Sequence, residues 1–206
     1  DKKRNMKELF HIRKAEIRNM GFSMKNIQKD RPTYDNEFGI DWNNLDVKDI
    51  NIKARNLMFK GGKMSGTAEQ ISFREKSGFI TRNITGEVIV GGGKTIIEDL
   101  HIDDGRSDVR LSLFMMSYKN ALSFQDFISE VRIDGEIDAS VLDFGTIAYF
   151  APELEGNSLR ADISGKVGGY VNDFSIYDIK VNSHYGGFSG TLSGKMTGLP
   201  DIGSTT

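Results

Sequence analysis

Residues 83–100, NITGEVIVGGGKTIIEDL, decide the fold of this chain. Their Gly93-Lys94-Thr95 is also the ending of a nucleotide-binding P-loop, which needs G-x-x-x-x-G-K-[ST] followed by a helix. The first glycine of that motif falls at position 88, where the chain has Val88, and the apolar residues after Thr95 are spaced in twos as in a strand. We therefore interpret the three glycines as a turn between two strands, with Lys94 solvated and no nucleotide bound.

The same alternation extends through most of the chain and is interrupted by turn signals at 60–63 (KGGK) and 103–106 (DDGR). It is typical of an antiparallel, hairpin-rich sheet with one dry and one wet face. The series expected to share a face include Ile50, Ile52 and Ala54; Ile80, Ile84, Gly86, Val88 and Val90; Ile96, Leu100 and Ile102; Val109, Leu111, Leu113 and Met115; Leu159, Ala161, Ile163, Gly165, Val167, Gly169 and Val171; and Phe188, Gly190, Leu192, Gly194 and Met196.

Three segments depart from the alternation. The residues SFQD at 123–126 resemble a capping box and predict a short helix over 123–128. Residues 140–150 have apolar side chains at helical spacing, and Pro152 is expected to end that helix. The segment 26–44 is polar and aperiodic, which indicates a loop. The two short helices would plug or cover one end of the sheet.

Glycines fall on the apolar phase of the strands, which is unusual because a glycine fills no core. Two interpretations stay open. The glycines permit tight bends or close approach in a closed β-sandwich, or they curl the sheet and leave room on its dry face for something the chain does not supply. The glycines concerned are Gly66, Gly86, Gly135, Gly165, Gly169, Gly190 and Gly194.

Composition excludes several function classes. The 206 residues carry 27 basic and 29 acidic side chains, a net charge of −2, and this balance does not indicate nucleic-acid binding. The absence of cysteine excludes a disulfide scaffold and a cysteine-based zinc site. No apolar run of about 18 residues is present, so no segment is expected to span a membrane. The chain starts at Asp1 rather than at methionine, and we expect it to be an internal piece of a longer protein.

Candidate catalytic and metal-binding residues are better explained structurally. His101 lies near Asp103 and Asp104, but DDG is typical of a solvated turn. Asp134, Glu136 and Asp138 alternate with isoleucines, as the wet face of a strand does, rather than forming a glycosidase pair. The one tryptophan, Trp42, is interpreted as an anchor for its loop, and no G-x-S-x-G nucleophile elbow is present. The sequence predicts no enzyme and no catalytic, cofactor-binding or metal-binding residue.

Four stretches resemble a known family: FGIDWNNLDVKDINIKARNLMFKGGKMSGTAEQISFREKSGF (38–79), LHIDDGRSDVRLSLFMMSYKNALSFQDFISEVRIDGEI (100–137), VLDFGTIAYFAPEL (141–154) and FSGTLSGKMTGLPD (188–201). They are similar to the TamB-type translocation and assembly module proteins of Bacteroidetes, within the AsmA-like group, best over residues 38–201. The resemblance implies a U-shaped, taco-like β-sheet with an apolar trough. It also implies a periplasmic location, an inner-membrane anchor on the full-length protein, and a role in outer-membrane protein assembly or phospholipid transport.

The expectation is therefore an all-β antiparallel sheet over residues 1–206, forming one β-repeat segment of such a protein, with two short helices. The alternative is a closed β-sandwich that serves as a binding or adhesion module. Expected partners are lipid or outer-membrane protein strands, an outer-membrane assembly partner of the full-length protein, and a second copy paired edge to edge; nucleic acid is not expected. The residues expected to line one apolar surface and contact lipid are Val88, Ile163, Val167, Val171 and Leu192.

Overall fold

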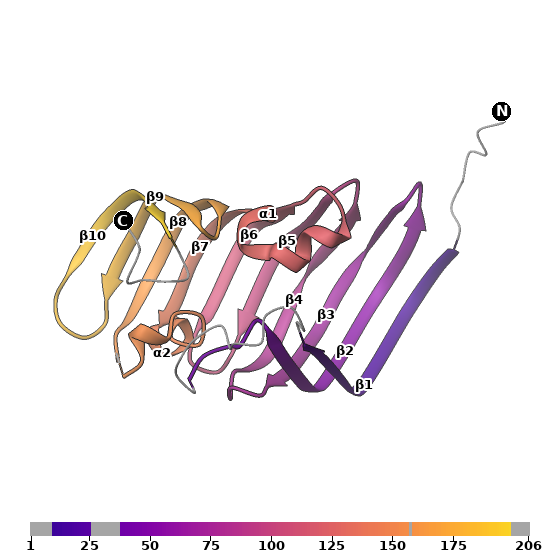
Figure 1. Ribbon diagram of the computed structural model, residues 1–206, viewed down its shortest axis with the longest axis horizontal. Coiled ribbons are helices and arrows are strands. Elements are labelled where there is room, and N and C mark those ends of the chain that lie inside the picture. The colour runs from indigo at the N-terminus through magenta and orange to yellow at the C-terminus, as the bar shows by residue number, and fades with distance from the viewer. Residues whose placement is uncertain (1–9, 26–37, 157, 199–206) are drawn as a thin grey trace.

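The computed structural model describes residues 10–25, 38–156 and 158–198, and within them ten strands form a single antiparallel sheet whose spatial order is the chain order. Figure 1 shows β1 at one end of this sheet and β10 at the other. The strands are β1 (Phe10–Lys25), β2 (Asn44–Lys60), β3 (Lys63–Glu75), β4 (Ile80–Gly91), β5 (Lys94–Asp103), β6 (Asp108–Ser117), β7 (Arg132–Asp143), β8 (Arg160–Tyr170), β9 (Asp173–Ser183) and β10 (Ser189–Thr197).

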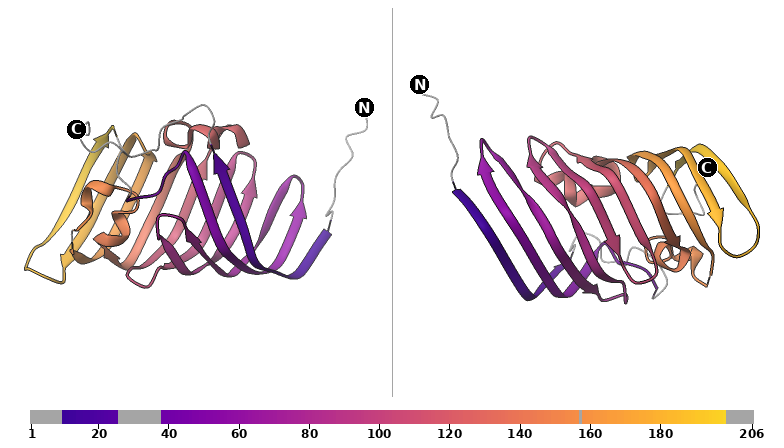
Figure 2. Two further views of the ribbon diagram at one scale, coloured as in Figure 1. Left: turned by 60° about the horizontal axis from the view of Figure 1, so that its bottom comes forward. Right: turned by 180° about the vertical axis from the view of Figure 1, so that it is seen from behind.

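The sheet bends along its strands into an open trough, most plainly at β1 and β2 (Figure 2). β-Bulges lie near the middle of several strands, at shifts of the pairing register. Asn or Asp residues with a left-handed backbone occupy these positions, for example Asn56 with φ 51° and Asp99 with φ 50°. A bulge adds one residue to one strand, bends that strand and increases its local twist. The bulges therefore account for the curvature of the trough.

This architecture is the predicted all-β, hairpin-rich, open sheet, and the alternative of a closed sandwich is wrong. A sandwich would place a second sheet against the first and seal the apolar side chains between them. Here all ten strands belong to one sheet, and most apolar side chains on its concave side are only half-buried. Among the described residues, Val131 and Ser123 are the largest side chains that are fully buried.

The predicted hairpin turn at the three glycines, residues 91–93, is confirmed. β4 ends at Gly91 and β5 begins at Lys94, so Gly92 and Gly93 form a two-residue hairpin loop. Both glycines have positive φ, 63° and 74°, as a type I′ turn requires. Lys94 is exposed. A strand, rather than a helix, follows the glycines, which removes the P-loop geometry.

Helical turns occur in the two regions where they were expected, but with different bounds. The β6–β7 connection contains η1 (Ala121–Asp126) and α1 (Phe127–Glu130), and its cap is Asn120, whose side chain accepts from the Leu122 amide, rather than Ser123. Ser123 is buried instead. The helical turn in the β6–β7 connection thus begins before residue 123, because Asn120 caps it upstream of the SFQD stretch.

The predicted helix over 140–150 is wrong in most of its length. β7 continues to Asp143, α2 covers only Phe144–Ile147, and η2 covers Pro152–Leu154. Pro152 therefore begins a turn of helix, where its missing N–H costs nothing, instead of ending one. Both connections lie on the concave side of the sheet, α1 at one margin and α2 at the other (Figures 1 and 2). The predicted loop at 26–44 falls mostly on residues 26–37, which are outside the described residues.

Candidate lipid-binding trough

Cross-strand neighbours on the concave side form continuous apolar rows that run along the trough. Residues paired across antiparallel strands point to the same side of the sheet, so a chain of pairs marks a row on one face. One such row, called here the Val88 row, reaches from β3 to β10. It consists of Gly66, Val88, Ile97, Phe114, Gly135, Val167, Ile176 and Gly194.

Three further rows flank the Val88 row, and none of the four contains a charged residue. The Met64 row, on the α1 side, consists of Phe10, Phe59, Met64, Val90, Thr95, Met116, Ile133, Gly169, Phe174 and Met196. The Leu100 row consists of Ala15, Ala54, Ala68, Gly86, Leu100, Leu111, Ile137, Gly165, Ile179 and Leu192. The Ile52 row consists of Ile17, Ile52, Ile71, Ile84, Ile102, Val109, Ser140, Ile163, Val181 and Gly190. We call the surface made by these four rows the inner face.

Four of the five residues predicted to line one apolar surface lie on the inner face. Val88 and Val167 belong to the same row, and Ile163 and Leu192 lie in neighbouring rows. Val88, Ile163 and Val167 are half-buried, whereas Leu192, on the edge strand β10, is 53% exposed. The fifth residue, Val171, lies outside the rows because β8 ends at Tyr170 and the turn to β9 follows.

Three of the predicted alternating series are wrong at shifts of the pairing register. In β4, Thr81 rather than Ile80 shares the side of Ile84, because Thr81 pairs with Phe73 and Ile84 pairs with Ile71. Asp99 shifts β5 by one residue, so Ile97 shares the inner face with Leu100 and Ile96 points to the opposite side. In β6 a register shift falls between Leu111 and Leu113, which places Phe114 rather than Leu113 inside. A one-residue shift exchanges the faces of all side chains beyond it. Periodicity within a strand therefore predicted the rows correctly only up to each bulge.

The inward glycines do not leave the gaps that the trough interpretation expected in the middle of the sheet. A Cβ on Gly66 would lie 2.6 Å from Cδ2 of Leu57, and one on Gly86 would lie 2.7 Å from Cγ2 of Ile97. On Gly165 it would lie 2.8 Å from the Ile179 backbone. Neighbouring aliphatic side chains therefore cover these glycines, whose role is close approach within the sheet. Among these glycines, those on β10 differ, because no described residue lies within 4 Å of the Cβ position of Gly190 or Gly194.

An aromatic cluster covers the α2 margin of the trough. The Phe79 ring lies 5.5 Å from that of Tyr149 and 5.3 Å from that of Phe150, between centroids. Phe38 stacks on Tyr149 at 4.9 Å, and the Ile40 amide donates to the Tyr149 carbonyl. Segments before β2 and after β7 are thus tied together, which narrows the opening on this side. The predicted loop anchor Trp42 contacts Phe150 at the edge of the same cluster.

A smaller cover lies at the α1 margin. Val131, directly after α1, is fully buried, and the Ile128 carbonyl accepts from the amide of Asn172 in the β8–β9 turn. Tyr118 contacts Phe124 edge to face and its hydroxyl lies 3.1 Å from that of Thr95, a member of the Met64 row. Leu122 remains 67% exposed. The described residues therefore cover the trough partly at both margins and leave it open between them.

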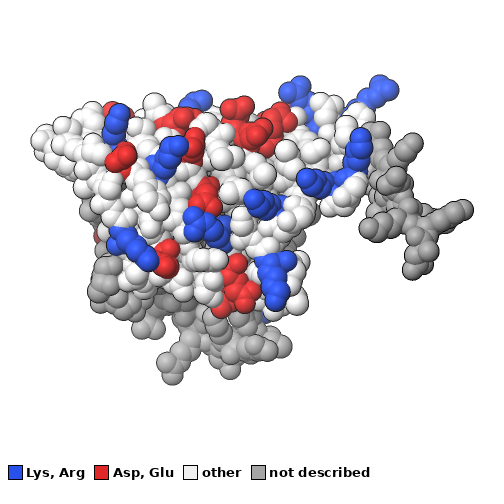
Figure 3. All heavy atoms as spheres, turned by 90° about the horizontal axis from the view of Figure 1, so that it is seen from above, with Lys and Arg blue, Asp and Glu red and all other residues white. Residues whose placement is uncertain are grey.

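The opposite, outer face carries paired charges. Lys166 contacts Glu136 and Arg132 contacts Asp134, which accounts for two of the three carboxylates of the DGEID stretch as members of a wet face. Burial by itself raises the pKa of Asp108. The nearby His101, whose Nε2 lies 3.1 Å from the carboxylate, and hydrogen bonds from Arg110 outweigh it, so this pKa lies below its ordinary value. In the view of Figure 3, acidic and basic side chains are interspersed over the part of the surface that faces the viewer.

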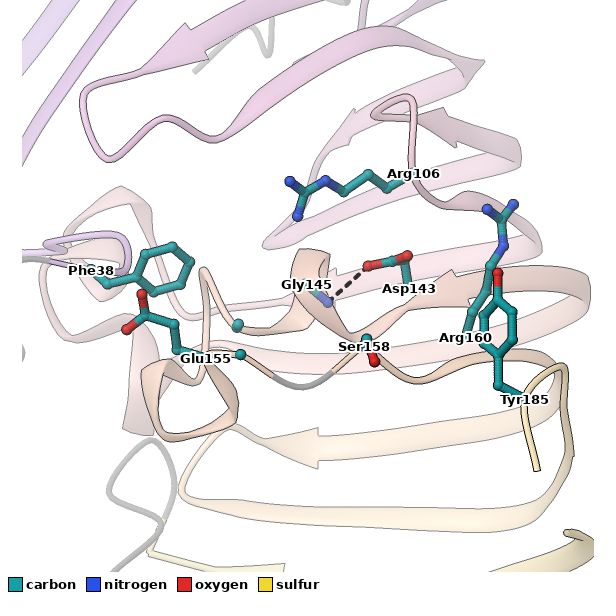
Figure 4. Close-up of a pocket in the computed structure, with 10 residues that line it drawn as sticks. Phe38, Arg106, Asp143, Gly145, Glu155, Ser158, Arg160 and Tyr185 are labelled. Carbon is teal, nitrogen blue, oxygen red and sulfur yellow. Dashed lines mark hydrogen bonds between the residues drawn. The ribbon is translucent and has the colours of Figure 1, made fainter. Parts of the chain in front are cut away.

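A polar hollow of about 590 Å³ lies beside α2, separate from the rows (Figure 4). Arg106 and Arg160 line it together with Asp143 and Glu155, so its charges have mixed sign. The carboxylate of Asp143 is already engaged by the Gly145 amide, at 2.9 Å. No group of His, Cys, Asp or Glu that could hold a metal ion occurs within the described residues. The inner face is therefore the stronger candidate site.

No protein-family model, curated protein or solved structure matches this chain. Among the described residues, no helix has both the length and the apolar character needed to cross a bilayer. The aromatic cluster and the inward Phe114 were not among the residues predicted for the site. The signal that could have found Phe114 is the three-residue step between successive inward positions, such as Leu111 to Phe114 and Ala54 to Leu57, which marks a bulge.

Proposed function

We propose that this chain is a non-enzymatic segment of a periplasm-spanning envelope biogenesis protein of the TamB type, whose trough contacts lipid acyl chains. The observation that carries the proposal is the inner face: apolar rows, free of charge, that cross the sheet. The Val88, Met64 and Ile52 rows are half-buried over most of their length, whereas most of the Leu100 row is buried. A monomeric protein rarely leaves a contiguous apolar patch larger than a few hundred Å² without a partner. The same function is what the resemblance of residues 38–201 to that family implies, and no family model or relative tests it.

The dimensions of the trough suit an acyl chain lying along the rows. Ten strands have nine spacings, and at about 4.8 Å each the rows run for roughly 43 Å. One leaflet of a bilayer core is about 15 Å thick, so a single tail would cover three or four strands. Each CH₂ removed from water contributes about 0.8 kcal/mol, which allows binding through many small contacts without one indispensable residue.

A photoactivatable fatty acid tests this proposal at residue level. The chain offers matched neighbours on opposite faces: Val88 is inner and Ile89 is outer, and Ile97 is inner and Ile96 is outer. After irradiation of the full chain with a diazirine-labelled fatty acid, peptide mass spectrometry should place the label on inner-face residues. Labelling centred on the outer residues Ile89, Ile96 and Met115 would overturn the proposal, since these also form a cross-strand apolar set.

A second candidate cargo is an extended strand of an outer-membrane protein. The observation that favours it is that no described strand pairs with the outer edges of β1 and β10, where a strand can add to a sheet through backbone hydrogen bonds. The fluorescence of cis-parinaric acid in the trough shows whether such a strand competes with lipid for the inner face. A peptide of alternating aliphatic and polar residues should displace the probe if strands occupy the inner face, and should leave the signal unchanged if they only add to an edge.

A further inference from the structure

Three lysines form a row at the α1 margin of the trough. Lys60 pairs with Lys63 across the β2–β3 hairpin, and Lys94 pairs with Gly91 across the β4–β5 hairpin. The two hairpins lie side by side, because a Cβ on Gly91 would lie 2.9 Å from the Gly62 carbonyl oxygen and 2.9 Å from Cγ of Lys63. All three lysines are exposed. We call Lys60, Lys63 and Lys94 the lysine row.

Uncharged rows flank the lysine row on both sides across β2–β6. On one side lies the Met64 row, the outermost row of the inner face on this margin. On the other side lies an outer-face row that consists of Met58, Ser65, Ile89, Ile96 and Met115. Four other lysines, Lys48, Lys76, Lys166 and Lys195, each contact a carboxylate. Within the described part of the chain, the lysine row has no such partner.

The pair formed by Lys60 and Lys63 is electrostatically unfavourable, since like charges directly opposite each other destabilise an antiparallel pair. An anion that bridges the two ammonium groups would remove this repulsion and accept charge-assisted hydrogen bonds from both. Alternation starts these side chains on the outer side of the rim, but the long lysine stem lets the ammonium group reach over it.

The hairpin tips present no side chain that would obstruct this reach. Gly61, Gly62 and Gly92 form the tips, and no described residue lies within 4 Å of their Cβ positions. Successive residues of a strand are about 3.3 Å apart, so an anion at the rim would lie within a few Å of the Met64 row. That separation suits the short glycerol linkage between the phosphate of a phospholipid and the first methylenes of its tail.

We propose that the lysine row binds the phosphate group of a phospholipid whose acyl chains lie on the inner face. The inference rests on the proposed function, because the inner face must hold the tails. The aromatic cluster around Phe79 covers the α2 margin, which favours the α1 margin as the side where the headgroup leaves the trough. The lysine row thus gives a bound lipid a defined orientation.

Two amphiphiles with the same twelve-carbon tail test the headgroup separately from the tail. Lauroyl lysophosphatidylglycerol carries a phosphate, and lauroyl glycerol carries none. Calorimetric titration of the full chain, below the micelle-forming concentration of each amphiphile, should give a Kd about tenfold lower for the one with the phosphate. In the variant Lys60→Gln, Lys63→Gln and Lys94→Gln, the two Kd values should become similar, while that of lauroyl glycerol stays unchanged.

The matched control is the variant Lys53→Gln, Lys166→Gln and Lys180→Gln. It removes the same charge from the outer face, away from the margin, and it should keep the preference for the phosphate. Both variants should melt near the temperature of the unchanged chain, because exposed charges contribute little to stability. A preference that the lysine-row variant keeps, or that the control variant loses equally, would overturn the inference.

The two amphiphiles and inorganic phosphate separate the possible failures. Equal Kd values for the two amphiphiles in the unchanged chain would overturn this inference and leave the trough standing. Binding of neither amphiphile would overturn the proposed function and the inference with it. Inorganic phosphate should bind far more weakly than lysophosphatidylglycerol, since the tail contributes through its burial. Binding of inorganic phosphate as tight as that of the lipid would show a site for the free anion and overturn the assignment to a headgroup.

Discussion

At the scale of single residues, the inward glycines fall into two groups that substitution should separate. Gly165 has φ 142° and no room, because an added Cβ would lie 2.8 Å from the carbonyl oxygen of Asp178. Gly190 has space around it and an ordinary extended backbone. We expect Gly165→Ala to lower the free energy of unfolding by about 1–3 kcal/mol, as strained backbones do. Urea denaturation measures the change.

Gly190→Ala is the matched control on the same face. Gly190→Ala should change the free energy of unfolding by less than about 1 kcal/mol. The alanine variant should be slightly the more stable, because alanine restricts the unfolded chain without straining the folded one. Equal losses of unfolding free energy in the two variants would show that the close approach of the chain at Gly165 is not the reason why this position needs glycine.

The ion pairs of the outer face should give a small dependence of stability on pH. Burial raises the pKa of Asp108, but the nearby His101 and hydrogen bonds from Arg110 hold it below its ordinary value. A carboxyl group whose pKa is lowered in the folded state stabilises the fold at pH values above the pKa of the unfolded chain, about 3.9. This contribution is lost as the pH falls through the pKa of the folded state. The carboxylate is 45% exposed, so the effect should stay below about 1 kcal/mol.

The comparison of the chain with Asp108→Asn measures this contribution. The difference in unfolding free energy between the two should be largest at pH 6 and should shrink as the pH falls below about 4. A difference that is constant from pH 6 to pH 3 would show that the carboxylate charge is not the cause.

At the scale of elements, bulges decide which residues face the trough. Asn56 is exposed and has φ 51°, a conformation that asparagine and glycine tolerate and β-branched residues do not. Asn56→Val should therefore cost about 1–2 kcal/mol by chemical denaturation. Asn56→Gly, which loses the same side chain, should be tolerated; a loss as large as that of the valine variant would mean that the asparagine side chain itself stabilises the bulge.

Bulges also explain which parts of the structure could be predicted from the sequence and which could not. Alternation identified the strands, the hairpin at 92–93 and the inward side of Val88, Val167 and the glycines, because those stretches contain no shift. It failed at Ile80, Ile96 and Leu113, beyond a one-residue insertion that periodicity averages away. It also extended a helix over 140–150, where apolar residues of β7 and of the aromatic cluster happen to follow a helical spacing.

The aromatic cluster belongs to this scale as well, since it joins elements distant in the chain. Phe79 is 8% exposed and contacts Phe73, Tyr149 and Phe150. Phe79→Ala should lower stability by about 3–5 kcal/mol, the usual cost of removing a buried aromatic ring. Hydrogen exchange should show faster exchange at the Ile40 amide, which bonds to the Tyr149 carbonyl; unchanged exchange there would contradict a joint cover over this margin.

At the scale of the whole molecule, the central claim is that the inner face is an open trough for acyl chains and not a sealed core. Val167→Asp places a carboxylate in the middle of the Val88 row. Ser164→Asp is the control on the same strand, because it puts the same charge on the outer face opposite Lys180. If the trough is open, water reaches the new carboxylate, and the fold should survive although the apolar row is interrupted.

The most direct measurement is therefore thermal melting of these two variants together with native mass spectrometry of their bound lipid. If the trough is open, Val167→Asp should melt near the temperature of the unchanged chain but lose bound lipid or cis-parinaric acid. Ser164→Asp should keep both the melting temperature and the bound lipid. Collapse of the fold in Val167→Asp would contradict the account, because a sealed core with an unpaired buried charge loses several kcal/mol. Full retention of lipid by Val167→Asp would contradict it equally, by placing the lipid elsewhere.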